Sequence, residues 1–212
     1  MVTGLSYILR HGPTAPSVRY IASGRASLAT ELSAEGRELC RALNRSATWL
    51  TSVESCTTSG FARTQETASL LLGERHVPTD VERRLDEVDY GCFDGGPWME
   101  YGRWLEEAGP GAVPNGADES WARCGARMLE GLSSLLSTPA TRLIVGHGLM
   151  IALLRRFSQP EELSSTRLPE AGYLKPLVLT DDVLAGLIER GRRELMAVTV
   201  QVPGDWRRSV HD

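Results

Sequence analysis

Residues 6–14 read Ser-Tyr-Ile-Leu-Arg-His-Gly-Pro-Thr, and this stretch decides the fold. A short apolar run, Tyr7 to Leu9, ends abruptly in a cation, an imidazole and a glycine. The pattern predicts a buried strand that delivers Arg10 and His11 to the carboxyl end of a sheet, where open α/β sheets bind their ligands. A guanidinium beside an imidazole suits an anionic ligand such as phosphate. A tripeptide such as Arg10-His11-Gly12 can occur by chance. It indicates a phosphate site only if the rest of the chain supplies its chemical partners.

The bulk composition is that of one globular α/β domain. The chain has 212 residues, of which 42% are hydrophobic and 24% charged, and its net charge is −4. This charge does not favour a nucleic-acid or anionic-membrane surface as partner. We find neither a signal peptide nor an apolar run near the ~20 residues that span a bilayer. Four widely spaced cysteines are typical of reduced thiols, so we expect a cytoplasmic protein. From the chain length we expect a single domain over residues 1–212.

Predicted strands and helices alternate along the chain, which indicates a three-layer α/β/α sandwich with a mostly parallel sheet. Strands are expected at residues 6–10, 53–58, 142–145, 173–179 and 196–202. Helices are expected at 61–72, 98–107, 118–137, 149–157 and 181–195, and after the cap residue Ser33, where Leu39, Leu43 and Leu50 form an apolar stripe. Residues 12–31 and 85–116 are predicted to be long loops, apart from the short helix at 98–107, and residues 181–212 a C-terminal extension of unassigned role.

Three later segments carry polar residues that fit the same kind of site. Residues 59–68 read Ser-Gly-Phe-Ala-Arg-Thr-Gln-Glu-Thr-Ala and put Arg63 in the first turn of a predicted helix. Residues 85–91 read Leu-Asp-Glu-Val-Asp-Tyr-Gly and place carboxylates in a loop. Residues 145–148 read Val-Gly-His-Gly, a second histidine at the end of a predicted strand.

These residue types support phosphoryl transfer. A neutral imidazole can attack phosphorus, provided that its other ring nitrogen is oriented, commonly by a backbone carbonyl. Arg10, Arg63 and a protonated His147 would stabilise the charge on the phosphoryl oxygens. A carboxylic acid held protonated near neutral pH, as Glu87 could be, would supply the proton that the leaving alkoxide needs. This chemistry requires no metal and no cofactor.

The four segments, in this order, resemble the histidine phosphatase superfamily, also called phosphoglycerate mutase-like. The family's Arg-His-Gly-x-Thr motif matches residues 10–14, and its Ser-x-x-x-Arg-x-x-(Gln/Glu)-Thr-Ala motif matches residues 59–68. Its Leu-x-Glu-x-x-x-Gly motif matches residues 85–91, and its late strand-His-Gly motif matches residues 145–148. The resemblance implies that His11 is the phosphorylated nucleophile.

The same resemblance assigns the remaining catalytic residues. Arg10, Arg63 and His147 would complete the phosphate pocket. Glu87 would be the proton donor, and its spacing from Leu85 favours it over the neighbouring carboxylates Asp86 and Asp89.

Substrate contacts are expected outside the motifs. By the resemblance, the backbone N–H of Leu149 would face the phosphate, and Ser17 and Arg25 in the early loop are candidates to touch the substrate. Three tryptophans are open to two interpretations, since Trp98, Trp104 and Trp121 could line a substrate cleft or pack in the core.

Three functions remain open at this point. The family includes phosphatases, in which water accepts the phosphoryl group, and mutases, which return it to the substrate. The short interval between Glu87 and His147 favours hydrolysis, because mutases of this family carry a longer insertion there. A non-catalytic phosphate-binding module is the third reading, weakened because all five expected catalytic residues are present. The partner would be a small phosphorylated metabolite, and a homodimer is compatible with the resemblance.

Overall fold

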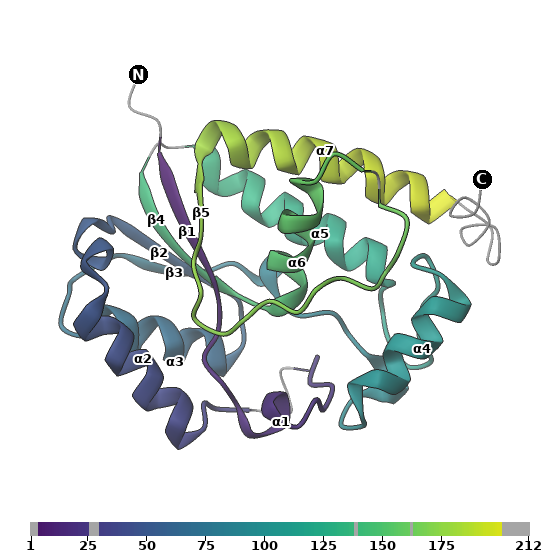
Figure 1. The fold of residues 1–212 in the computed structure, drawn as a ribbon, viewed down its shortest axis with the longest axis horizontal. Helices are drawn as coiled ribbons and strands as arrows, with labels where there is room; N and C mark the ends of the chain where they lie inside the picture. The colour runs from purple at the N-terminus through teal and green to yellow at the C-terminus, as the bar shows by residue number, and fades with distance from the viewer. Residues whose placement is uncertain (1–3, 26–29, 138–139, 162, 201–212) are drawn as a thin grey trace.

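A five-stranded sheet in the order β3-β2-β4-β1-β5 separates two helical layers (Figure 1). The computed structural model describes residues 4–25, 30–137, 140–161 and 163–200. The strands are β1 (Leu5–Arg10), β2 (Ser55–Thr58), β3 (Thr79–Val81), β4 (Thr141–Gly146) and β5 (Leu177–Thr180). Strands β1 to β4 run parallel and β5 pairs antiparallel with β1, which confirms the mostly parallel sheet.

Helices cover both faces of the sheet, so the predicted three-layer sandwich is confirmed. One layer holds α2 (Ala34–Ser46), the 3₁₀ turn η1 (Thr48–Ser52) and α3 (Ala62–Leu72), and the other holds α5 (Trp121–Ser134), α6 (Gly148–Phe157) and α7 (Asp181–Val200). Successive strand residues point to opposite faces. Leu9 and Val145 therefore pack with α2 and α3, whereas Ile8 and Ile144 pack with the other layer.

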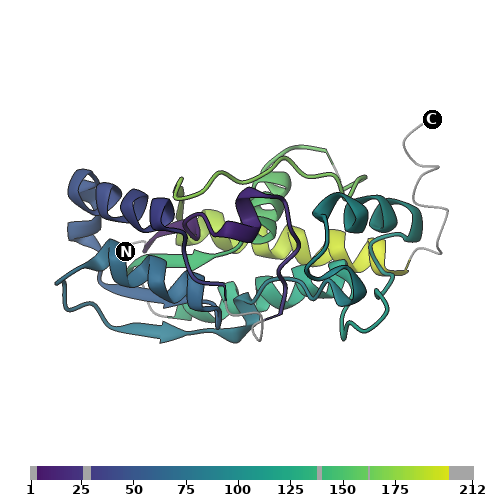
Figure 2. The same ribbon diagram turned by 90° about the horizontal axis from the view of Figure 1, so that it is seen from below.

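Four further elements lie near the carboxyl ends of the strands: α1 (Ala15–Val18), α4 (Trp98–Ala108) and the 3₁₀ turns η2 (Arg83–Leu85) and η3 (Gly91–Phe93). A last 3₁₀ turn, η4 (Leu135–Ser137), follows α5 and comes before the amino end of β4. Helix α4 lies at the end of the molecule away from the sheet (Figures 1 and 2). Backbone hydrogen bonds join the early loop to the start of α4, from Ala22 N to Gly96 O (2.9 Å) and from Trp98 N to Tyr20 O (2.7 Å).

Two helix boundaries differ from the prediction. The helix expected at 118–137 begins only at Trp121, because Ser120 is the cap and its Oγ accepts a hydrogen bond from Arg123 N at 3.2 Å. The strand expected at 196–202 is wrong over residues 196–200, where α7 continues. Its Leu195 and Val198 are buried at helical spacing, so packing overrides the strand preference of the β-branched residues. Residues 201 and 202 lie outside the described chain.

Smaller differences concern exposed and edge positions. The apolar stripe expected after Ser33 is wrong at Leu39, which is 43% exposed, and α2 instead buries Gly36 and Cys40. Strand β3 was not predicted, because its three residues are all exposed at the sheet edge and show no alternation. The last strand begins at Leu177 rather than Tyr173.

Helix α7 is part of the domain core rather than an appendage. Its Leu184 and Ile188 are buried in the same cluster as residues of α5 and α6. An ion pair between Arg142 Nη1 of β4 and Asp181 Oδ1 (2.6 Å) attaches the start of α7 to the sheet. None of the helices in the described ranges is both long and apolar enough to cross a bilayer.

Candidate functional site

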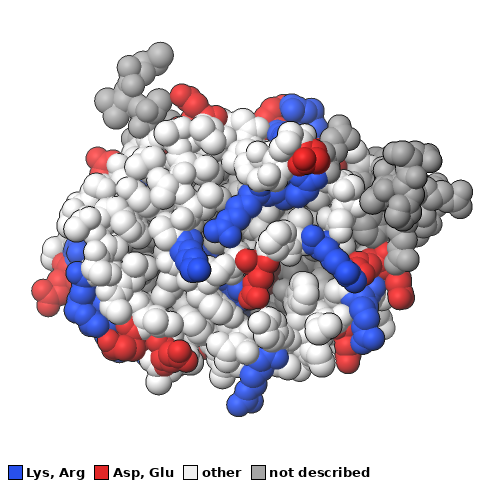
Figure 3. All heavy atoms as spheres, viewed as in Figure 1, with Lys and Arg blue, Asp and Glu red and all other residues white. Residues whose placement is uncertain are grey.

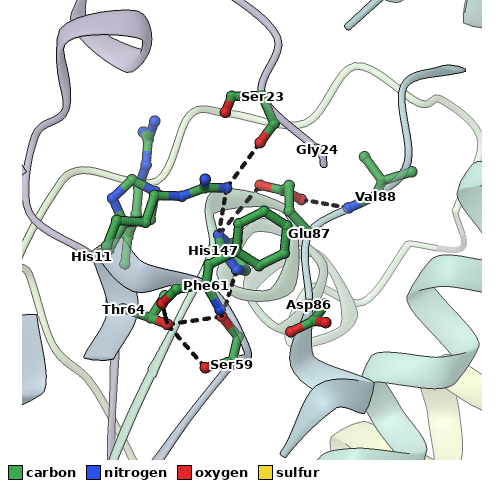
Figure 4. A network of polar contacts seen from close by, with 12 residues as sticks. His11, Ser23, Gly24, Ser59, Phe61, Thr64, Asp86, Glu87, Val88 and His147 are labelled. Carbon is green, nitrogen blue, oxygen red and sulfur yellow. Dashed lines mark hydrogen bonds and ion pairs between the residues drawn. The ribbon is translucent and has the colours of Figure 1, made fainter. Parts of the chain in front are cut away.

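The ends of three adjacent strands bring the predicted polar residues together. His11 follows β1, Ser59 follows β2 and His147 follows β4, and these strands are neighbours in the sheet. The ring centroids of the two histidines are 5.5 Å apart. Figure 4 shows both rings with Ser59 and Glu87 close by.

His11 is a buried, neutral imidazole. Its Nδ1 donates to the carbonyl oxygen of Gly12 at 2.7 Å, since a carbonyl can only accept. Its Nε2 therefore carries the lone pair and accepts from Arg63 Nε at 3.1 Å. Burial, and next the charge of Arg63, lower the pKa of His11 well below its usual value. The ring is thus held as the tautomer that can attack through Nε2.

Arg63 is the central cation of the site. It sits in the first turn of α3, and its Nη2 donates to Ser23 O at 2.9 Å and lies 3.3 Å from His147 Nδ1. Its Nη1 donates to Thr30 Oγ1 at 3.1 Å. Burial lowers the pKa of Arg63, but a guanidinium stays charged in proteins. The early loop and α3 therefore fix a positive charge against both imidazoles.

His147 differs from the protonated cation expected from the sequence. Burial, and next the charge of Arg63, lower its pKa well below the usual value, so the ring is neutral. Because Arg63 can only donate to Nδ1, the proton lies on Nε2, which donates to Ser59 Oγ at 2.9 Å. Ser59 lies in turn 2.8 Å from the hydroxyl of Thr64 (Figure 4). The sequence motif contains Ser59 but indicates no role for it, and the structure identifies it as the partner that orients His147.

Arg10 is held by the segment that precedes β5. Its Nη1 donates to Glu170 Oε1 (2.8 Å) and Ala171 O (2.7 Å), and its Nη2 donates to Tyr173 OH (3.1 Å). The guanidinium also lies over the Tyr173 ring, 3.9 Å from its centroid. Its Nε is buried and has no hydrogen-bond partner in the described chain, so it remains for a ligand oxygen. The local sequence carries no signal for these contacts, because they join residues 160 or more positions apart.

Glu87 is the carboxylate that enters the site. Its Oε2 lies 3.9 Å from His147 Nδ1, and its Oε1 accepts from Val88 N at 3.0 Å. Burial raises the pKa of Glu87, and the nearby Arg63 opposes this rise. Asp86 instead accepts from Gly60 N at 2.5 Å, and Asp89 from Gly91 N at 2.9 Å. These two carboxylates support loops, which leaves Glu87 to face the histidines.

A cavity of about 640 Å³ opens in front of these groups, within the range of small-molecule sites. The expected residues that line it are Arg10, His11, Ser17, Arg63, Glu87 and Leu149, with Trp98 and Trp121. Ser17 also caps α1 through Thr14. Three expectations are not met. Arg25 donates to Gly116 O (2.6 Å) and Trp104 packs on Phe93 and Tyr101, and neither Arg25 nor Trp104 belongs to the lining. His147 is fully buried and is not among the lining residues either.

Backbone groups add to the positive end of the cavity. Helices α3 and α6 both begin at the site, and neither has a side-chain cap. Gly148, at the start of α6, lies beside Arg10, since a Cβ on Gly148 would be in van der Waals contact with Nε at 3.6 Å. Free N–H groups at a helix N-terminus attract anions. Across residues 4–25, 30–137, 140–161 and 163–200 no cluster of three metal-ligating side chains is found. The arrangement is suited to a tetrahedral anion next to a nucleophilic nitrogen.

Comparisons with known proteins point the same way. The sequence model of the histidine phosphatase superfamily (branch 1) matches residues 6–173. No curated protein sequence matches the chain significantly. Among solved structures, Bacillus stearothermophilus YhfR is 24% identical, with a TM-score of 0.62 over 73% of this chain and 80% of that one. A mycobacterial glucosyl-3-phosphoglycerate phosphatase in complex with VO3 is 25% identical, with a TM-score of 0.60 over 72% and 82%. The alpha-ribazole phosphatase of Shigella flexneri is 24% identical, with a TM-score of 0.57 over 72% and 79%.

Proposed function

Since the chain belongs to branch 1 of the histidine phosphatase superfamily, we propose that it is a metal-independent phosphomonoesterase acting on a small organic phosphate. The observation that carries the proposal is the state of His11. Its ring is buried and neutral, and its Nε2 lone pair lies 3.1 Å from the Arg63 guanidinium. A bound phosphoryl group would replace this contact and lie between the nucleophile and the cation.

The first half-reaction forms a phosphohistidine. His11 Nε2 attacks phosphorus, an N–P bond forms, and the bond from phosphorus to the ester oxygen breaks. Glu87 gives its proton to the departing alkoxide, a role that its raised pKa supports. Arg63, Arg10 Nε and the α6 N-terminus stabilise the charge on the phosphoryl oxygens.

The second half-reaction returns the enzyme to its starting state. Water attacks the phosphohistidine, the N–P bond breaks, and its electron pair goes back to His11 Nε2. The Glu87 carboxylate takes one proton from that water, and inorganic phosphate leaves. Hydrolysis is favoured over return of the phosphoryl group because the names of two structural neighbours describe phosphatases.

The test is release of phosphate from a generic aryl phosphate in the presence of EDTA. We expect turnover by the intact protein and its loss in His11→Ala. His76→Ala is the matched control, because His76 is an exposed histidine away from the site and its removal should leave the rate unchanged. Rapid acid-free quenching should trap an alkali-stable, acid-labile phosphate on His11.

Other outcomes would contradict the proposal. Absence of turnover over a broad panel of phosphomonoesters would favour a binding module. Bisphosphate-dependent conversion of 3-phosphoglycerate to 2-phosphoglycerate would instead establish a mutase.

A further inference from the structure

Most of the cavity lies beyond the phosphate end and is built from apolar side chains. Tyr20, Ile21, Trp98 and Met99, which we call the apolar wall, come from the early loop and the start of α4. Leu149 and Leu168 add further aliphatic surface. A phosphoryl group occupies only a small part of about 640 Å³, so the remainder is available to the alcohol part of an ester.

Three of the four side chains in the apolar wall are exposed. Tyr20 is 60% exposed, Trp98 44% and Met99 68%. Exposed large apolar side chains that gather in one place mark binding surfaces, because their contact with water is unfavourable and a ligand that covers them removes it. All three side chains line the same cavity, so a ligand in it would be in position to cover them.

The wall is also held in place by the backbone. Tyr20 has φ = 55°, a left-handed conformation that is unfavourable for a bulky residue and is typical of functional sites. Its carbonyl accepts from Trp98 N at 2.7 Å, and Ile21 forms a bridge with Pro97. The surface is therefore formed before any ligand arrives.

Charged side chains at the cavity are mostly paired with each other. Arg10 pairs with Glu170 at 2.8 Å, and Arg167 pairs with Glu106. Arg103 is exposed, so its charge remains in water. In the view of Figure 3, basic and acidic side chains lie next to one another around the centre of the face that is drawn. Burying an additional charge against the apolar wall would cost its hydration without a partner in return.

We propose that this site takes phosphate monoesters of uncharged, apolar alcohols at least as large as one aromatic ring. The inference rests on the proposed phosphatase function, since it names the group that leaves from His11. In the bound substrate, the alcohol part contacts the apolar wall, and the phosphoryl group lies against Arg10, His11 and Arg63.

The test compares three esters of primary alcohols, so that the leaving groups are similar in basicity. They are 2-(1-naphthyl)ethyl phosphate, glucose 6-phosphate and 3-phosphoglycerate. We expect kcat/KM to be at least about tenfold higher for the naphthyl ester, because burial of aromatic surface is favourable. Preference for glucose 6-phosphate, or for 3-phosphoglycerate through Arg103, would overturn the inference while leaving the phosphatase function intact.

Three variants test whether the preference depends on the apolar wall. Trp98→Ala should lower kcat/KM for the naphthyl ester about tenfold, mainly through KM, and change that for glucose 6-phosphate less than about twofold. Met99→Ala should act in the same direction, whereas Met196→Ala is its matched control, since Met196 on α7 is 67% exposed and lies outside the lining. An equal loss for all esters would overturn the inference.

Binding measurements separate the preference for apolar alcohols from the phosphatase activity, because binding does not require turnover. The non-hydrolysable phosphonate analogues of the naphthyl and glucose esters are measured by calorimetry. Tighter binding of the naphthyl phosphonate without turnover would overturn only the phosphatase function. Equal binding would overturn the inference.

Discussion

The chemistry of single residues here depends on where protons reside. His11 and His147 are both buried and both neutral, but their neighbours select opposite tautomers. Gly12 O accepts a hydrogen bond from Nδ1–H of His11, which keeps the proton on Nδ1, and donation by Arg63 to Nδ1 of His147 places that ring's proton on Nε2. The same burial that removes the charge of the imidazoles raises the pKa of Glu87. One desolvated site thus holds a neutral base and favours a protonated acid.

The lowered pKa of His11 and the raised pKa of Glu87 predict how activity depends on pH. His11 must be neutral, and its lowered pKa keeps it so to lower pH than an ordinary histidine, so the acid limb of kcat/KM lies below pH 6.5. Glu87 must be protonated, and activity falls as the pH rises through its raised pKa. We expect a bell-shaped profile whose alkaline limb disappears in Glu87→Gln. An unchanged alkaline limb in this variant would assign it to another group.

Glu87→Gln also separates leaving groups. For alkyl phosphates we expect kcat to fall about 10²–10⁴-fold, because the alkoxide then leaves without a proton. For 4-nitrophenyl phosphate the loss should be much smaller, since nitrophenolate leaves unprotonated. Steady-state rates for the two esters test this, and an equal loss for both would argue against proton donation.

At the scale of elements, the site depends on loops that lie directly against one another. A Cβ on Gly24 would lie 2.0 Å from the backbone oxygen of Val88. Gly24 follows Ser23, whose carbonyl binds Arg63, and Val88 follows Glu87. The close approach of these two backbones therefore sets the distance between the cation and the acid.

Gly24→Ala should push the two loops apart. We expect kcat/KM to fall by about tenfold or more, because small displacements of catalytic groups are costly. Gly186→Ala is the matched control, since a Cβ there meets nothing within 4 Å. That control should keep full activity and gain about 0.5–1 kcal/mol of stability from helix propensity. Thermal unfolding and initial rates on both variants measure this, and full activity in Gly24→Ala would contradict the argument.

At the scale of the whole molecule, helix α7 contributes to the core without lining the cavity. Helix α7 packs on α5 and α6 and is joined to the sheet by Asp181 and Arg142, while the cavity-lining residues all precede it in the described chain. Residues 181–200 of the predicted extension are thus a structural part of the domain. A substitution that removes contacts between α7 and the core should lower the stability of the fold without changing the shape of the cavity.

Ile188→Ala tests this separation. Ile188 is 2% exposed, so we expect a loss of about 2–5 kcal/mol in the free energy of unfolding, with KM unchanged. Val183→Ala on the same helix is the control, because Val183 is 50% exposed and its removal should cost little. Denaturant unfolding gives both values, and equal losses would mean that α7 does not contribute to the core.

The sequence by itself determined the sandwich, the strand ends that carry His11 and His147, and the position of Glu87 among three carboxylates. The sandwich and the strand ends follow from local periodicity and from the rule that parallel strands end at one edge, whereas Glu87 is singled out by its spacing from Leu85 in the family motif. Only the tertiary structure decided that His147 is neutral, that Glu170 and Tyr173 hold Arg10, and that Arg25 lies away from the cavity. The reason is physical: burial and the partners of a charge come from segments far apart in the chain, so a pKa, a tautomer or an apolar wall exists only after folding.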